Sequence, residues 1–349
     1  MRVDARTPVR LPVVDLARRL EAMQPEVDDA VRRVVGSGRL LLGDEVAGFE
    51  AEFAAFAGRR HAVAVASGTD ALRLSLTVMG IGVGDEVIVP AFTAVPTVAA
   101  VCATGATPVL ADVDPESGGL DPQSVAAAVT DRTAAVVPVH LYGRPVPIPD
   151  VGVPVVDDAA QAHGAVPASP TRATVYSFYP TKNLGGIGDG GAVVTDDAAL
   201  ADHVRLLRNH AREGGYNHRF VAGNSRMSEV EAAVLRIGLA RLPGLNQRRR
   251  WIAAQYRRSA PDLGWHPAHP RHVHHLCVLR TPDRESFRAR MPFDTDVHYP
   301  VAISQQPAYR RFARRPCPNA EAWAAECVTI PCFPEMADDE IEMVCQALR

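Results

Sequence analysis

Short apolar runs alternate with amphipathic stretches along the first half of the chain. The apolar runs predict strands, and the stretches between them, whose apolar residues recur at helical spacing, predict helices. Two amphipathic helices are expected first, over 25–35 and 44–57, and each is followed by a glycine. The alternation continues with strands at 61–66, 86–90, 108–113 and 134–139 and helices at 69–79, 93–103 and 122–129. This pattern predicts an α/β fold whose mostly parallel central sheet is covered by helices on both faces.

The second half of the chain continues the sheet and then changes character. Strands are expected at 153–158, 173–178 and 192–195, and helices over 196–209 and 228–242 flank a long polar loop at 210–226. A smaller α+β unit begins near residue 261, with strands at 273–280 and 295–299 and helices at 285–290, 320–327 and 338–348. We therefore expect a large domain over 1–245 and a smaller C-terminal α+β domain over 246–349.

Lys182 is the only lysine among the 37 basic residues of the chain, and the others are arginines. Only an amine of adjustable pKa can lose its proton and hold a carbonyl compound as a Schiff base, which a guanidinium cannot do. If a side chain of this protein performs imine chemistry, it is Lys182.

The residues around Lys182 favour a flat, phosphorylated ligand. Ser177 lies five residues before Lys182, and glycines follow Lys182 at 185, 186, 188, 190 and 191. A hydroxyl at the end of a strand can bind a phosphate, and glycines let backbone approach a ligand closely. The glycines at 186, 188 and 191 also satisfy the dinucleotide fingerprint, but a strand rather than a helix is expected after them, which argues against that interpretation.

Two further segments are placed to complete such a site. Ser67-Gly68-Thr69-Asp70 is expected to open a helix directly after a strand, where free amides can bind a phosphate or, alternatively, form an ordinary N-cap. Asp157 and Asp158 end an apolar strand, and a carboxylate there can keep a pyridine nitrogen protonated. Because ligands of parallel sheets bind beyond the carboxyl ends of the strands, Thr69, Phe92, Asp158 and Ser177 are expected to meet.

These motifs resemble the DegT/DnrJ/EryC1/StrS family of sugar aminotransferases. The matching segments are S-G-T-D-A-L at 67–72, D-D-A-A-Q-A-H-G at 157–164, S-F-Y-P-T-K-N-L-G at 177–185, G-N-S-R-M-S-E at 223–229 and H-Y-P at 298–300. The resemblance covers nearly the whole chain and implies the aspartate-aminotransferase-like fold of type I enzymes that use pyridoxal 5'-phosphate.

The resemblance also implies roles for single residues. Lys182 would hold the cofactor and move the proton, and Asp158, rather than Asp157, would face the pyridine nitrogen. Cofactor contacts are implied for Gly68, Thr69, Phe92, Gln161 and Ser177, and for Asn224 of a second copy of the chain in a homodimer with shared active sites. Substrate contacts are expected from His163, Arg219, Arg226, His298 and Tyr299, although His163 is equally explained as a buried core residue.

The chain departs from the family pattern in two places. Ala94 stands where relatives carry an aromatic residue that stacks on the cofactor ring. Phe92 is the alternative stacking residue or a core residue, and the sequence does not separate the two. The connections at 143–153 and 164–174 are also shorter than in relatives, which indicates trimmed peripheral elements.

Composition excludes several other classes of protein. A net charge of −3 and a pI near 6.5 give no case for nucleic acid or an anionic membrane. The first six residues lack the apolar core of a secretion signal, so we expect a cytoplasmic protein. Six cysteines without a C-x-x-C pair, and histidines at 272, 274 and 275 without further ligands, predict no metal site.

The resemblance implies transfer of an amino group from L-glutamate to a nucleotide-linked keto-6-deoxyhexose. The G-D-G-G segment ending at Gly191 resembles that of family members acting on 3-keto sugars more than that of members acting on 4-keto sugars. Three alternatives are a cyclitol aminotransferase acting on a keto-inositol, a sugar dehydratase, which Lys182 argues against, and a non-catalytic regulatory protein that binds the cofactor.

Overall fold

The computed structural model describes residues 10–166 and 171–349. The first six residues, in which no secretion signal is expected, and part of the 164–174 connection therefore lie outside the described residues. The elements follow one another as α1 (Leu16–Glu21), α2 (Gln24–Ser37), α3 (Asp44–Ala57), β1 (His61–Val65), α4 (Gly68–Val78), β2 (Glu86–Pro90), α5 (Val95–Ala103), β3 (Thr107–Ala111), α6 (Pro122–Ala128), β4 (Thr133–Val136), β5 (Val156–Asp158), β6 (Ala173–Ser177), β7 (Gly191–Thr195) and α7 (Ala198–Leu207). The remainder comprises α8 (Glu229–Ser259), β8 (Gly264–Trp265), β9 (Cys277–Arg280), α9 (Arg284–Arg290), α10 (Pro318–Glu326), β10 (Cys327–Ile330) and α11 (Asp338–Leu348), besides short 3-10 turns.

The central sheet has the strand order β3-β2-β4-β5-β6-β7-β1. Its two parts, β3-β2-β4 and β5-β6-β7-β1, are joined by parallel bridges from Val136 to Val155 and from Val139 to Asp158. Strand β2 pairs in parallel with β3 and β4, and β5 with β6, whereas β7 is antiparallel to both of its neighbours. The predicted α/β fold with a mostly parallel sheet is confirmed.

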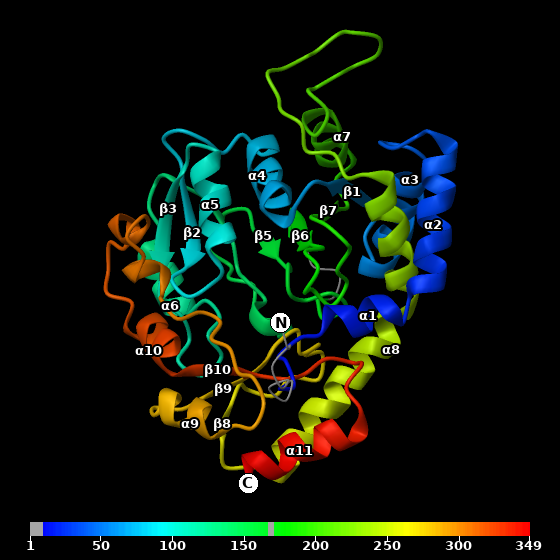
Figure 1. Ribbon diagram of the computed structural model, residues 1–349. Coiled ribbons are helices and arrows are strands. Elements are labelled where there is room, and N and C mark those ends of the chain that lie inside the picture. Colours follow the sequence, from blue (N-terminus) through cyan, green and yellow to red (C-terminus); the bar gives the residue numbers. More distant parts are fainter. Residues whose placement is uncertain (1–9, 167–170) are drawn as a thin grey trace, which may run out of the picture.

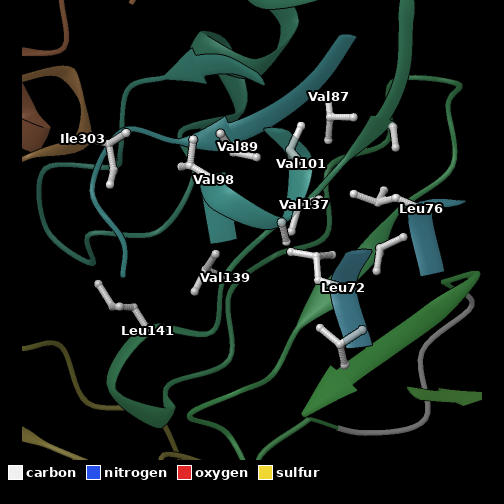
Figure 2. Close-up of a cluster of buried hydrophobic side chains, with 14 of the residues drawn as sticks. Leu72, Leu76, Val87, Val89, Val98, Val101, Val137, Val139, Leu141 and Ile303 are labelled. Carbon is white, nitrogen blue, oxygen red and sulfur yellow. The ribbon is translucent and has the colours of Figure 1, made fainter. Parts of the chain in front are cut away.

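Helices α4 and α5 cover one face of this sheet. Figure 2 shows their buried side chains meeting those of the strands and of the segment after β4, among them Leu72, Leu76, Val87, Val89, Val98, Val101, Val137 and Val139. A second cluster, which includes Phe49, Phe53, Tyr176 and Phe178, packs α3 and α8 against β6 and β7. Because strands of the central sheet contribute to both clusters, its strands read as continuous apolar runs rather than alternating ones.

Helix α8 differs most from the prediction. It continues beyond residue 242 to Ser259 and contains Pro243. In Figure 1 its first part lies beside α2 and α3 and its last part beside α11. The domain boundary expected at 245/246 falls inside this helix, and the division into two domains stays a prediction.

Two predicted strands of the C-terminal unit are wrong in extent or in kind. Residues 295–299 form only one bridge, from Asp296 to Thr329, and no strand. Strand β9 begins at Cys277 rather than 273, since the preceding residues turn through His274 at φ 43°. His272 and His274 stack with ring centroids 3.7 Å apart, and no group of metal ligands occurs among the described residues.

Helix α1 and strands β8 and β10 were not predicted. All three are six residues long or shorter, so they show little periodicity. In the part of the chain that the structure describes, no helix is long and apolar enough to cross a bilayer.

Candidate active site

The carboxyl ends of β1, β5 and β6 meet at one cavity of about 910 Å³. Eight of the predicted site residues line it: Gly68, Thr69, Asp158, Gln161, Ser177, Lys182, His298 and Tyr299. Ala94, Val139 and Leu276 contribute apolar surface, and Asp189, Asp294 and Asp296 contribute carboxylates. Three of the four residues that the strand-end argument expected to meet, Thr69, Asp158 and Ser177, line the cavity, and Phe92 does not.

Gly191 explains why the end of β1 lies so close to the end of β6. It pairs with Val65 on one side and with Ser177 on the other. A Cβ at Gly191 would lie 2.3 Å from the carbonyl carbon of Ser67, so only glycine lets the turn after β1 pass over β7.

The start of α4 and Ser177 form a narrow cradle. A Cβ on Gly68 would lie 2.6 Å from the Cβ of Ser177, which brings the hydroxyl of Ser177 beside the amides that open the helix. The Ser67 side chain caps the helix by accepting from the Asp70 amide at 3.1 Å, so the N-cap explanation also holds. Free amides, a helix N-terminus and a hydroxyl together suit a phosphate group.

Asp158 is almost entirely buried at the base of the cavity. Its Oδ2 accepts a hydrogen bond of 2.8 Å from the Thr97 hydroxyl, and its Oδ1 accepts one of 3.1 Å from the Ala160 amide. Burial raises the pKa of the Asp158 carboxyl, while these hydrogen bonds and the charge of Lys182 oppose the rise. A buried carboxylate of this kind gains from a cationic partner such as a pyridinium.

Lys182 follows β6 in a turn that directs its side chain to the same cavity. Burial lowers the pKa of its amine to about 8, and the nearby Asp158 carboxylate acts in the opposite direction. An amine with this pKa is partly unprotonated near neutral pH, which nucleophilic attack and proton transfer require.

Gln161 and Tyr299 form a second polar wall. The Gln161 side chain accepts from the Tyr142 amide at 2.7 Å and donates to the Tyr299 hydroxyl at 3.1 Å. His298 contacts the Thr329 hydroxyl at 2.9 Å through Nδ1. These contacts fix the side chains that face the cavity from the C-terminal unit.

Five predicted site residues do not line the cavity. Phe92 is 1% exposed and stacks on Trp323 at a centroid distance of 5.8 Å, and it therefore belongs to the core. His163 is fully buried behind Ser177, whose carbonyl lies 2.9 Å from its Nε2. Arg219, Asn224 and Arg226 lie on the α7–α8 loop, which projects from the molecule at the top of Figure 1.

Sequence reasoning missed three residues that support the site. Thr97 binds Asp158, Arg19 of α1 donates to backbone carbonyls around Lys182, and Asn183 donates to Asn246 of α8 at 2.8 Å. Asn183 lies in the quoted 177–185 motif, but a threonine in an apolar helix and one arginine among many carry no local signal, so no pattern in the sequence marks Thr97 or Arg19.

The residues of the cavity fit pyridoxal phosphate. A Cβ-free cradle with free amides suits the phosphate, a buried carboxylate suits the pyridine nitrogen, and an amine of lowered pKa suits the aldehyde. Ala94, at the position where the family resemblance implies an aromatic residue, lines the cavity, and its methyl group cannot stack on the cofactor ring as an aromatic side chain would.

Comparisons with known proteins agree with this fit. Residues 21–349 match the DegT/DnrJ/EryC1/StrS aminotransferase family. The chain is 44% identical to dTDP-3-amino-3,4,6-trideoxy-alpha-D-glucose transaminase of Streptomyces venezuelae, over 99% of this chain and 97% of that protein.

Two solved structures are similar along almost the whole chain. The crystal structure of S. venezuelae DesV in complex with a ketimine intermediate superposes with a TM-score of 0.93 at 42% identity and covers 97% of this chain and 98% of that one. NtdA of Bacillus subtilis with bound cofactor PMP has a TM-score of 0.91 at 25% identity and covers 98% of this chain and 85% of that one. The chain belongs to the DegT/DnrJ/EryC1/StrS family and is a pyridoxal-phosphate-dependent aminotransferase.

Proposed function

We propose that this enzyme transfers an amino group from L-glutamate to a nucleotide-linked 3-keto-6-deoxyhexose. The observation that carries the choice of sugar is the 44% identity, over 99% of the chain, to a transaminase whose product is a 3-amino sugar linked to dTDP. The cavity agrees with a partly deoxygenated sugar, since Leu276, Val139 and Ala94 offer it apolar contacts.

Lys182 and Asp158 carry the chemistry in this proposal. Bound pyridoxal phosphate supplies an aldehyde that accepts the amino group and a ring that withdraws electrons from the reacting carbon. The Lys182 amine would take a proton from the donor carbon in the first half-reaction and would deliver a proton to the acceptor carbon in the second, because its lowered pKa lets it act as base and as acid near neutral pH. Asp158 would keep the pyridine nitrogen protonated, and the hydrogen bond from Thr97 orients that carboxylate.

The remaining cavity residues would bind and orient the cofactor and the sugar. The Ser177 hydroxyl and the amides of Gly68 and Thr69 would hold the phosphate, and Gln161 would lie near the ring hydroxyl, since all four residues line the cavity. His298 and Tyr299, which line it from the C-terminal unit, would contact the sugar.

We also propose that two copies of the chain share their active sites. L-Glutamate and a nucleoside diphosphate are both anionic, yet Lys182 is the one lysine or arginine among the described residues that line the cavity. The projecting loop carries the exposed side chains of Arg212, Arg219 and Asn224 and the half-buried side chain of Arg226. In a homodimer this loop brings those cations, and Asn224 for the phosphate, to the partner's cavity.

The direct test is a comparison of acceptors with purified enzyme, pyridoxal phosphate and L-glutamate. dTDP-linked 3-keto-4,6-dideoxyglucose, dTDP-linked 4-keto-6-deoxyglucose and a keto-inositol are offered in parallel, and aminated products are measured by mass spectrometry. The proposal predicts turnover of the 3-keto sugar at least about tenfold faster than of the others. Preferred turnover of the inositol supports the cyclitol alternative, and no turnover of any acceptor supports the regulatory one.

A further inference from the structure

The backbone around Lys182 is held by a side chain from the N-terminal helix. Arg19 of α1 donates through Nη1 to the carbonyl oxygens of Pro180 at 2.9 Å and Lys182 at 2.8 Å. Through Nη2 it donates to the carbonyl of Gly185 at 2.8 Å, with a longer contact of 3.5 Å to that of Asn183. One guanidinium therefore contacts four backbone carbonyl groups in the turn that carries the lysine.

Carbonyl oxygens that point at one place are stabilised by a cation with several hydrogen-bond donors. Carbonyl dipoles that point at one another repel, and the fixed fork of a guanidinium can satisfy several of them at once. Within residues 10–166 and 171–349, none of the ion pairs includes Arg19. Burial, followed by the nearby charge of Arg249, lowers the pKa of Arg19 to about 10, so the guanidinium stays charged at neutral pH.

The opposite side of the turn is fixed separately. Asn183 donates to the Asn246 side chain at 2.8 Å and to the carbonyl of Val273 at 3.0 Å. Asn246 in turn donates to the carbonyl of His163 at 2.8 Å. Because α8 holds Asn183, the contacts of Arg19 are those that fix the Lys182 carbonyl itself.

Helix α1 is anchored well enough to act as a support. Arg18 forms two hydrogen bonds of 2.7 Å with Glu340 of α11. Val13 and Val14, just before α1, line the cavity. The same short segment thus contacts the cavity mouth, the C-terminal helix and the lysine turn.

We propose that Arg19 is a positioning residue, which fixes the backbone of Lys182 so that the amine stays in the cavity beside Asp158 and away from bulk water. The inference rests on the proposed role of Lys182 as the reacting amine. Loss of Arg19 loosens the turn, hydrates the amine and returns its pKa toward that of an ordinary lysine.

The single lysine of the chain gives a clean experiment on the cofactor-free enzyme. Reductive methylation with formaldehyde is measured across pH 6–11 by peptide mass spectrometry, which separates Lys182 from the N-terminal amine. Arg19→Met is the main variant. Arg241→Met is the matched control, because Arg241 donates to the carbonyl of Ala22 at 2.7 Å, just after α1, but not to the lysine turn.

The expected result is a labelling midpoint for Lys182 that rises by about one pH unit in Arg19→Met and stays unchanged in Arg241→Met. With cofactor and substrates, Arg19→Met should also lower kcat by about tenfold at an unchanged KM for the sugar. A folded Arg19→Met protein with the wild-type midpoint overturns the proposal.

If circular dichroism shows that Arg19→Met is unfolded, Arg19→Gln takes its place and is judged by the same midpoint. The amide of glutamine keeps part of the hydrogen bonding, which favours folding, but it cannot reach all the carbonyls. Because the labelling needs neither cofactor nor sugar, its outcome is independent of which acceptor the enzyme aminates.

Discussion

The Thr97 hydroxyl donates a 2.8 Å hydrogen bond to the buried carboxylate of Asp158, and this pair joins the first turn of α5 to the end of β5. Thr93 extends the contact, since its hydroxyl lies 3.2 Å from that of Thr97. The carboxylate is thereby oriented before any cofactor enters the cavity, at a position where burial opposes its charge.

Replacement of Asp158 by asparagine should lower kcat by at least about 100-fold, because a neutral amide cannot keep the pyridine nitrogen protonated. Thr97→Val keeps the carboxylate and should cost about tenfold. Steady-state kinetics with L-glutamate and the best acceptor would measure both losses. A Thr97→Val enzyme as impaired as Asp158→Asn would show that orientation, rather than charge, is decisive.

Gly68→Ala should weaken binding of pyridoxal phosphate by about tenfold or more, because the new methyl group lies 2.6 Å from the Cβ of Ser177 and closes the cradle. Fluorescence titration of the cofactor-free protein measures the Kd. Gly36→Ala in α2 is the control, since a Cβ there meets nothing within 4 Å. If Gly68→Ala and Gly36→Ala bound pyridoxal phosphate with the same Kd, the start of α4 beside Ser177 would not be the phosphate site.

Mixed dimers test the shared active sites. Lys182→Ala and the double variant Asn224→Ala/Arg226→Ala should each be nearly inactive alone. Random reassembly of equal amounts should restore about a quarter of wild-type activity, because half of the dimers then contain one intact site. Activity that stays absent after reassembly is confirmed by native mass spectrometry would show that each chain uses its own loop.

The pH dependence of stability should reflect Glu231 at the start of α8. Burial raises the pKa of this carboxyl to about 7, and a Cβ on Gly186 would lie 1.5 Å from its Oε1. A carboxyl whose pKa is higher in the folded than in the unfolded protein binds more protons when folded. Its contribution therefore favours folding as pH falls from 7 toward 4.5 and opposes folding above 7.

Glu231→Gln should accordingly raise the free energy of unfolding at pH 8 by about 1 kcal/mol or more, and by less at pH 5. Urea denaturation at the two pH values measures the difference. Neighbouring Glu229 is a matched contrast, since its carboxylate accepts from the amides of Gly43, Glu45 and Val46 at 2.7–3.1 Å. Glu229→Gln should destabilise the protein at both pH values, and stabilisation there would contradict this assignment.

The sequence predicted those parts of the site that depend on strand ends and on residue chemistry. Asp158 and Ser177 end neighbouring strands, so the alternating pattern predicted that they lie close together. Lys182 was identified because it is the only lysine of the chain. Gly68 and Thr69 followed from the strand-to-helix turn after β1. The α/β sheet was predictable for the same reason, because apolar runs and amphipathic stretches differ in period.

The supporting contacts were not predictable, because they depend on tertiary packing between distant segments. Arg19 comes from a six-residue helix with too few turns to show a period. The choice between stacking and core for Phe92 was open in the sequence, and the structure places the ring against Trp323 in the core. The strand expected at 295–299 was wrong because an extended pattern does not show which residues find a pairing partner, and in this segment only Asp296 bridges to another residue, Thr329.

The most direct test of the central claim, that Lys182 holds the cofactor in an aminotransferase, is the visible absorption spectrum of the purified protein with pyridoxal phosphate. The account predicts a yellow protein whose band is replaced by that of the amine form when L-glutamate is added. It also predicts a Lys182→Ala protein that lacks the band of the lysine-bound cofactor. A wild-type protein that stays colourless with added pyridoxal phosphate would contradict the account.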